Sequence, residues 1–85
     1  MEVFFTKTFR KKFNKMPVKI QQKFEERIDI FIKNPIADEL RVHSLKGNLV
    51  GYRAFSVTGD YRVIFKIIGP NKCRLIDIGT HNQVY

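Results

Sequence analysis

Five side chains in the later part of the chain could together perform acid–base chemistry on a phosphate: His43, Asp60, Arg62, His81 and Tyr85. Histidine, with an unperturbed pKa of about 6.5, takes up or releases a proton at neutral pH. Arginine is a permanent planar cation, and tyrosine stacks on bases or donates to phosphate. Metal-free RNA cleavage needs a base for the ribose 2′-OH, an acid for the leaving 5′-oxygen and a cation for the growing charge. The set therefore fits RNA cleavage, although a single histidine is more often structural, and sequence spacing does not show that the five converge.

Metal, cofactor and thiol chemistry find no support in the sequence. The two histidines and the single cysteine lack ligand spacing, with no Cys-x-x-Cys and no His-Glu-x-x-His, and no glycine-rich phosphate loop is present. We therefore expect neither a metal nor a cofactor. Cys73 is predicted to be a small core residue, and one cysteine without a partner fits a reducing compartment.

The net charge of +8, from 16 basic and 8 acidic residues, favours a polyanion or an acidic protein as partner. Lysines recur every fourth residue near the start of the chain, at Lys7, Lys11, Lys15, Lys19 and Lys23. They could follow a phosphate backbone, or they could be the solvated face of two helices. Both interpretations remain open at this stage.

The composition is that of one folded domain. The chain has 85 residues, of which 44% are hydrophobic, so it has room for one core, and we expect a single domain over residues 1–85. The early apolar run Val3–Phe5 is too short for a signal peptide or a membrane span. We expect a cytoplasmic protein with no membrane contact.

The elements that would have to position these residues begin with a strand at 3–5 and a helical hairpin. Thr6 or Thr8 is predicted to cap the first helix, in which Phe9, Phe13 and Met16 form an apolar stripe. Pro17 suits the first turn of a second helix, which the pair Asn34–Pro35 ends. The core face of that helix is expected to carry Ile20, Phe24, Ile28 and Phe31.

After an irregular stretch over 35–48, the apolar period changes to that of strands. We predict strands over 50–57, 60–68 and 73–78, the last one central in the sheet. The predicted fold class is α+β, with an N-terminal strand and a two-helix hairpin packed on one face of an antiparallel sheet of about four strands.

A two-residue loop at Thr58–Gly59 would place Phe55 opposite Arg62. Arg53, Asp60 and Arg62 would then share one polar, working face of the sheet. The opposite face would take the helices and would carry Tyr52, Tyr61, Val63 and Phe65. A bulge in either strand would reverse this assignment.

Three stretches carry a resemblance to a known family: LKGNLVGYR at 45–53, SVTGDYRVIF at 56–65 and LIDIGTH at 75–81. Together they resemble the RelE/ParE toxin superfamily, and most closely its YafQ-like mRNA interferases. The resemblance covers the whole chain in element order. It implies a twisted antiparallel sheet with the helical hairpin on one side, and a toxin of a type II toxin–antitoxin system that cuts mRNA, often on the ribosome, without a metal.

The resemblance also implies roles for particular residues. His81 matches the C-terminal catalytic histidine of the YafQ-like branch, and His43 and Asp60 match its earlier histidine and its hairpin aspartate. Arg62 matches an arginine that contacts phosphate. The expected RNA-binding residues are Lys46 and Tyr85, which the resemblance implies, and Arg53, from its place on the predicted polar face of the sheet. One departure is Ser56, where that branch has a further histidine, so two imidazoles remain for acid and base.

The same resemblance leaves two other functions open. The chain could be a ParE-like toxin that binds gyrase without any chemistry, or a catalytically weakened member that only binds RNA or its antitoxin. In each case the expected partner is a small acidic antitoxin that covers the basic surface in a toxin–antitoxin hetero-oligomer. For the nuclease, mRNA and the ribosome are further expected partners.

Overall fold

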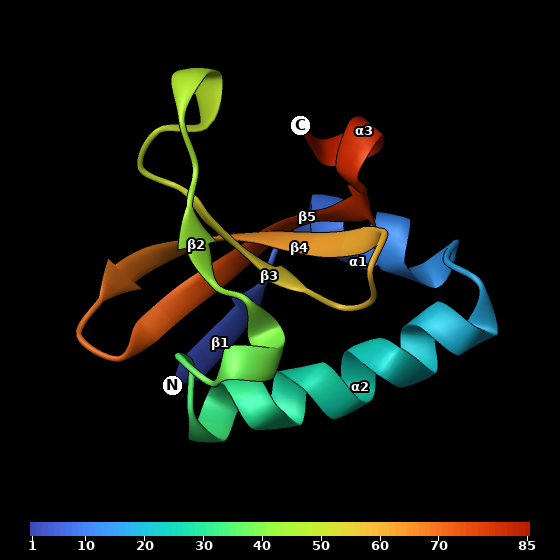
Figure 1. Cartoon of the computed structure of the whole chain (residues 1–85), viewed down its shortest axis with the longest axis horizontal. Coiled ribbons are helices and arrows are strands. Elements are labelled where there is room, and N and C mark those ends of the chain that lie inside the picture. Colours follow the sequence, from blue (N-terminus) through green and yellow to red (C-terminus); the bar gives the residue numbers. More distant parts are fainter.

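The computed structural model describes residues 1–85 as a mixed sheet with helices on both faces (Figure 1). In chain order the elements are β1 (Glu2–Phe5), α1 (Lys7–Asn14), α2 (Val18–Lys33), the 3₁₀ turn η1 (Asp38–Leu40), β2 (His43–Ser44), the 3₁₀ turn η2 (Gly47–Leu49), β3 (Arg53–Ser56), β4 (Tyr61–Gly69), β5 (Lys72–Thr80) and α3 (His81–Val84).

The sheet has five strands in the order β1-β5-β4-β3-β2. β1 runs parallel to β5 and every other pair is antiparallel. The α+β class is confirmed, and β5 lies inside the sheet between β1 and β4 as expected of the last strand, although the middle place belongs to β4. The additional strand is β2, whose two residues lie in the stretch expected to be irregular, because pairing with β3 extends the backbone there. The run 45–52 folds into η2 and turns, so β3 is shorter than predicted.

The helical hairpin forms where the sequence predicts it. The Thr6 hydroxyl accepts a hydrogen bond from Phe9 N (3.1 Å) and donates one to Leu75 O (2.9 Å), so the cap of α1 is also its attachment to β5. The Gln21 side chain donates to the carbonyls of Phe13 (3.1 Å) and Met16 (3.2 Å), which joins the start of α2 to the end of α1 and the turn after it. α2 begins after Pro17 and ends at Lys33, as predicted.

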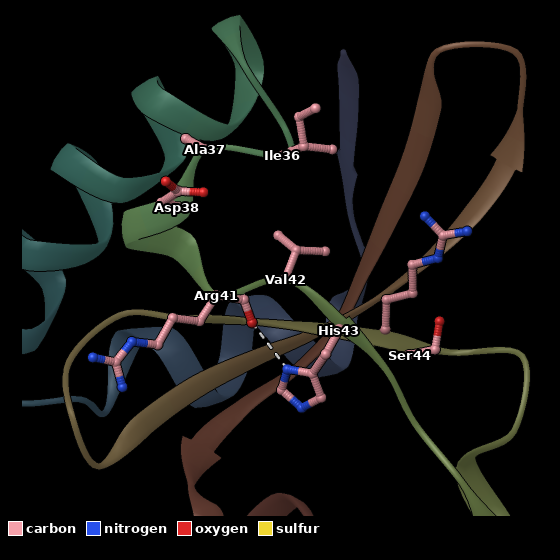
Figure 2. A pocket seen from close by; sticks show the side chains of 8 residues that line it. Ile36, Ala37, Asp38, Arg41, Val42, His43 and Ser44 are labelled. Carbon is pink, nitrogen blue, oxygen red and sulfur yellow. Dashed lines mark hydrogen bonds between the residues drawn. The ribbon is translucent and has the colours of Figure 1, made fainter.

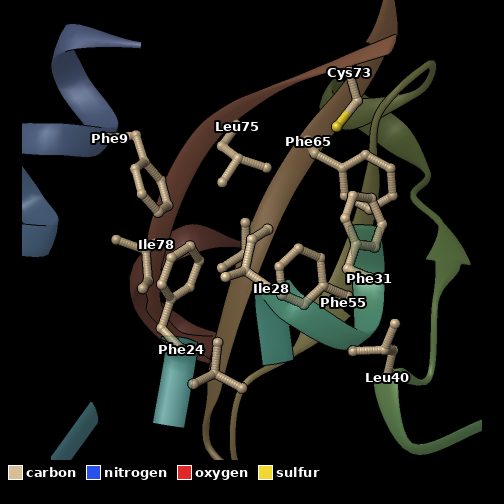
Figure 3. Close-up of a cluster of buried hydrophobic side chains, with 12 residues drawn as sticks. Phe9, Phe24, Ile28, Phe31, Leu40, Phe55, Phe65, Cys73, Leu75 and Ile78 are labelled. Atoms are coloured by element: carbon tan, nitrogen blue, oxygen red, sulfur yellow. The ribbon is translucent and has the colours of Figure 1, made fainter. Parts of the chain in front are cut away.

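Aromatic rings fill the core between α2 and the sheet (Figure 3). The ring of Phe31 is fully buried, with its centroid 4.9 Å from that of Phe55 and 5.0 Å from that of Phe65. Phe24 and Ile28 bury the rest of the same stripe of α2. Cys73 is also buried here, and burial raises the pKa of its thiol to about 11, so it is an inert core residue as predicted.

The β3–β4 hairpin differs from the prediction by one residue of register. Four residues, not two, connect the strands, because the Thr58 hydroxyl accepts hydrogen bonds from the N–H groups of Asp60 (3.3 Å) and Tyr61 (3.1 Å) and closes a wider turn. Phe55 therefore pairs with Val63, and Ser56 pairs with Arg62. The predicted pairing of Phe55 with Arg62 is wrong.

Directly paired residues point to the same face of a sheet. The observed register therefore puts Arg53 and Tyr52 on the faces opposite to those predicted for them. Arg53 pairs with Phe65 and so belongs to the helix-covered face, at its edge, and not to the face of Arg62. Tyr52 packs instead on the opposite face, against Ala54 and Ile64. The predicted grouping of Arg53 with Arg62, and of Tyr52 with the core, is therefore wrong.

Replacing Phe31 by alanine removes the ring at the centre of the core. We expect the free energy of unfolding to fall by about 3–5 kcal/mol, a large share of the 5–15 kcal/mol typical of a domain. Urea denaturation measures this loss. The matched control is Ile32→Ala on the next residue, which is 42% exposed and is expected to cost less than about 1 kcal/mol. Equal losses in the two variants would contradict the assignment of Phe31 to the centre of the core.

Candidate functional site

The face of the sheet opposite α2 carries the candidate site. In Figure 1, α3 and the yellow-green segment over residues 45–52 lie on one side of the sheet and α2 lies on the other. Val84 of α3 packs on Ala54 and Ile64, with Leu45 and Tyr52 beside them, in a small second core. The chain end is thereby fixed on the sheet.

Gly79 allows α3 to lie this close. A Cβ atom at this buried position would stand 2.9 Å from Gln83 Oε1 and 3.1 Å from Val84 Cγ1, closer than side-chain contacts normally are. Gln83 Oε1 in turn accepts a hydrogen bond from Thr80 N (2.9 Å), as in a capping box. The backbone N–H of His81 donates to the carbonyl of Asp60 (3.1 Å), which ties the start of α3 to the β3–β4 loop.

The two histidines meet at one tyrosine. The Tyr85 hydroxyl lies 3.3 Å from His43 Nε2. The rings of His81 and Tyr85 are in edge contact, with centroids 4.4 Å apart and planes at 83°. Residues from β2 and from the last helix thus form one exposed cluster, as the RNA-cleavage hypothesis requires.

A backbone carbonyl sets the tautomer of His43. His43 Nδ1 lies 2.9 Å from Arg41 O, the contact drawn in Figure 2. A carbonyl oxygen only accepts, so Nδ1 carries the proton, and in the neutral ring Nε2 has a free lone pair. The Tyr85 hydroxyl then donates to that lone pair. His43 therefore presents a basic nitrogen toward Tyr85, and the carbonyl stabilises the ring when it becomes charged.

Arg62 reaches the same tyrosine. Its Nη1 donates to the carbonyl of Gly59 (3.0 Å), which fixes the guanidinium at the hairpin end of the face. Partial burial raises the pKa of the Tyr85 hydroxyl above its usual value of 10, while the positive charge of Arg62 nearby acts in the opposite direction. The phenol is thus a neutral donor at physiological pH, with a cation beside it.

The structure brings His43, His81, Tyr85 and Arg62 together, and it separates the other candidates from them. Asp60 takes part through its backbone carbonyl, and its exposed side chain makes no hydrogen bond or ion pair. Lys46 precedes η2 and bonds to none of the four through its side chain. Arg53 belongs to the helix-covered face and lines the pocket shown in Figure 2 together with residues 36–38 and 41–44, so His43 is the one residue of the cluster that borders the same pocket.

Sequence reasoning missed Arg41, the residue whose carbonyl orients His43. Arg41 has φ 49° and ψ 46°, a left-handed conformation that residues other than glycine, asparagine and aspartate rarely adopt. The type of the residue gave no signal, because arginine is an ordinary surface residue in an irregular segment.

The structure also shows no group of three His, Cys, Asp or Glu side chains placed to hold a metal ion, and none of its helices has the length and apolar character needed to cross a membrane.

Comparisons with known proteins agree on one family. The model of a family described as the bacterial toxin of type II toxin–antitoxin system, YafQ, matches residues 1–85. No curated protein matches the sequence.

Among solved structures, a YoeB/ParE toxin from Agrobacterium tumefaciens superposes with a TM-score of 0.77 at 19% identity, covering 95% of this chain and 99% of the toxin. YafQ from E. coli strain BL21(DE3) gives 0.73 at 22%, with 99% and 97% covered. The toxin fold in the E. coli DinJ–YafQ complex gives 0.73 at 20%, also with 99% and 97% covered. At these identities the structures show a shared fold.

Adding one methyl group at Gly79 should displace α3. In Gly79→Ala the new Cβ has to move Gln83 and Val84, and we expect a loss of about 1–3 kcal/mol in unfolding free energy together with faster amide exchange over residues 81–85. Gly59→Ala is the control, since a Cβ there meets nothing within 4 Å and the variant should stay within about 0.5 kcal/mol of wild type. Unchanged exchange in Gly79→Ala would show that α3 is held by other contacts.

The pKa of Tyr85 should depend on the positive charge of Arg62. In Arg62→Gln the positive charge that lowers the Tyr85 pKa is lost, so the pKa should rise further above 10, as followed by ¹³C NMR of the tyrosine ring. A raised pKa in the folded state means that the associated stability is present below the unfolded pKa of about 10 and is lost as the pH rises through the folded value. Arg74→Gln, which removes a charge from an exposed position on β5, should leave the titration unchanged. A lower Tyr85 pKa in Arg62→Gln would refute this effect of the charge.

Proposed function

Because this chain belongs to the YafQ family of bacterial toxins of type II toxin–antitoxin systems, we propose that it is an endoribonuclease that cleaves mRNA by acid–base chemistry without a metal. The observation that carries this proposal is the meeting of His43 and His81 at Tyr85, with the positive charge of Arg62 close enough to act on the same hydroxyl. A base, an acid and a permanent cation within reach of one hydroxyl are the groups that cleavage through the ribose 2′-OH requires.

His43 acts as the general base. Its Nε2 is unprotonated in the tautomer that the Arg41 carbonyl selects, and it faces the centre of the cluster. It takes the proton of the 2′-OH as the 2′-oxygen forms a bond to phosphorus. The imidazolium that results is stabilised through Nδ1–H by the same carbonyl.

His81 acts as the general acid. Its ring is exposed at the start of α3, against the edge of Tyr85, and its backbone is fixed by Asp60 O. In its charged form it gives a proton to the 5′-oxygen as the bond from phosphorus to that oxygen breaks. The products are a 2′,3′-cyclic phosphate and a free 5′-hydroxyl, and each ring ends the step in the protonation state opposite to the one it started with.

Arg62 and Tyr85 stabilise the charge that grows on phosphorus. The guanidinium supplies the positive charge. The neutral Tyr85 hydroxyl, which donates to His43 in the free protein, turns to a phosphate oxygen when the substrate enters. Asp60 positions His81 through its backbone carbonyl, and we assign it no direct chemical step.

Ser56, the position where the YafQ-like branch has a further histidine, does not leave a role vacant in this scheme. It pairs directly with Arg62 across the hairpin and is half-buried. Base and acid are both supplied by the remaining two imidazoles. We assign Lys46 to the substrate backbone, since the segment 45–52 lies on the same side of the sheet as α3 (Figure 1). Arg53, on the other face, is left out of the site.

The partner of the toxin is an antitoxin protein. A type II system pairs the toxin with such a protein, and one of the similar structures is a DinJ–YafQ complex. With a net charge of +8, this chain favours an acidic antitoxin. We place its action in the cytoplasm, on mRNA at the ribosome.

Removing the imidazole of His81 should abolish cleavage. In His81→Ala we expect the rate of mRNA cleavage to fall by about 10²–10⁴, because the leaving oxygen loses its acid. The measurement is primer extension on a defined mRNA incubated with purified protein, with and without ribosomes. Asn82→Ala on the adjacent exposed residue is the matched control and should cleave like wild type.

Two outcomes would count against the nuclease. Full cleavage by His81→Ala would remove His81 from the reaction. Intact mRNA with the wild-type protein, together with double-strand breaks in DNA when gyrase is added, would identify a gyrase-binding toxin in its place.

A further inference from the structure

A second pocket, outside the cluster around Tyr85, lies at the loop end of the β3–β4 hairpin and is lined by three arginines. It measures about 270 Å³, and one guanidinium comes from each of α2, the segment between η1 and β2, and β4. The lining residues are Arg27, Glu39, Arg41, Ser56, Val57, Thr58, Gly59 and Arg62. Arg62 is therefore common to this pocket and to the candidate active site.

Arg27 leaves a hydrogen-bond donor unused at this pocket. Its Nη1 donates to the carbonyl of Glu39 (3.3 Å), but its Nε is buried and has no partner. Almost all buried polar atoms in proteins are paired, so the guanidinium of Arg27 has hydrogen-bonding capacity that the protein itself does not use.

Arg41 is held at the pocket in a strained conformation. A left-handed backbone at an arginine costs free energy that glycine would avoid, and such strain concentrates at ligand and catalytic sites. The conformation is stabilised in part by the bond from Arg41 N to Asp38 O (3.1 Å). It directs the carbonyl of Arg41 to His43 while the side chain lines the pocket.

The pocket carries uncompensated positive charge. None of the three arginines forms an ion pair, since the three salt bridges of the protein join Lys12 to Asp77, Lys23 to Glu26 and Lys72 to Glu2. Glu39 is the one acidic residue in the lining. Planar guanidinium groups match the geometry of phosphate oxygens, and three of them against one carboxylate favour an anionic ligand.

We propose that this pocket binds a phosphate of the RNA strand next to the one that is cleaved, an inference that rests on the proposed nuclease function. A strand carries one phosphate per nucleotide, so a substrate with its scissile phosphate at Arg62 has another one nucleotide away. Arg62 lines the pocket and its charge also acts on Tyr85, which gives the strand a path from the cluster to Arg27 and Arg41. A carboxylate of a protein partner is not covalently linked to the reacting phosphate, so the position of Arg62 between the two places favours RNA as the ligand of the pocket.

The test uses the double variant Arg27→Gln/Arg41→Gly and a fluorescent single-stranded 2′-O-methyl RNA 12-mer, which cannot be cleaved through its 2′-oxygens. We expect the Kd to rise about tenfold, the loss of one charge-assisted phosphate contact. The slope of log Kd against log salt concentration should fall by about 0.7, the value for one phosphate contact on a single strand. The double variant Lys33→Gln/Arg74→Gln, which removes two charges at exposed positions outside the pocket, controls for the loss of net charge and should change the slope less.

Glycine at position 41 separates binding from folding. It keeps the carbonyl that orients His43 and adopts the left-handed conformation without strain. The melting temperature of the single variant Arg41→Gly should therefore be equal to or above that of wild type, while its Kd for the 12-mer rises.

The inference fails if Arg27→Gln/Arg41→Gly has the Kd and salt slope of the control Lys33→Gln/Arg74→Gln. It also fails if the double variant loses affinity for a hexaglutamate peptide but not for the 12-mer, since the pocket would then dock acidic protein. Binding of the 12-mer is measured without cleavage. Suppose the slope of log Kd against log salt concentration falls in the double variant, but the wild-type protein leaves mRNA intact. The proposed phosphate pocket would then be supported, and the proposed nuclease activity would be contradicted.

Discussion

The candidate site depends on the contact between a glycine and the helix that follows it. Gly79 is buried near the end of β5, and the side chains of Gln83 and Val84 occupy the space that any Cβ would need. This close approach lets the chain turn back onto the sheet within a few residues. His81 and Tyr85 are therefore held against the sheet by packing, and chain ends that lack such contacts are normally frayed.

A second constraint is the backbone of Arg41. Its left-handed conformation costs on the order of 1–3 kcal/mol, which is a substantial part of the stability of a small domain. The same conformation turns a carbonyl to His43 Nδ1 and places a guanidinium beside Arg27. The conformation of this one residue thus determines both the orientation of the proposed base and the position of a guanidinium at the proposed phosphate pocket.

The two faces of the sheet divide the work between stability and chemistry. Rings from α2 and the strands fill one face with the tightly packed core around Phe31. The other face has only the small cluster of Ala54, Ile64 and Val84, and it carries the exposed histidines. A sheet made rigid from one side can hold polar groups in fixed positions on the other, so a protein of 85 residues supports a precise site.

The sequence by itself determined the α+β class, the helical hairpin, the place of the last strand inside the sheet and the family, because these follow from local periodicity, from turn and cap residues such as Thr6 and Pro17, and from short motifs. It also named four of the side chains that meet at the site. Only the tertiary structure decided the hairpin register, since a hydroxyl at Thr58 was enough to widen the turn and to move Arg53 to the other face. The pairing of β2 with β3 was likewise beyond sequence reasoning, because it joins two segments through backbone hydrogen bonds that no side-chain pattern marks, and the left-handed backbone of Arg41 had no signal in the type of the residue.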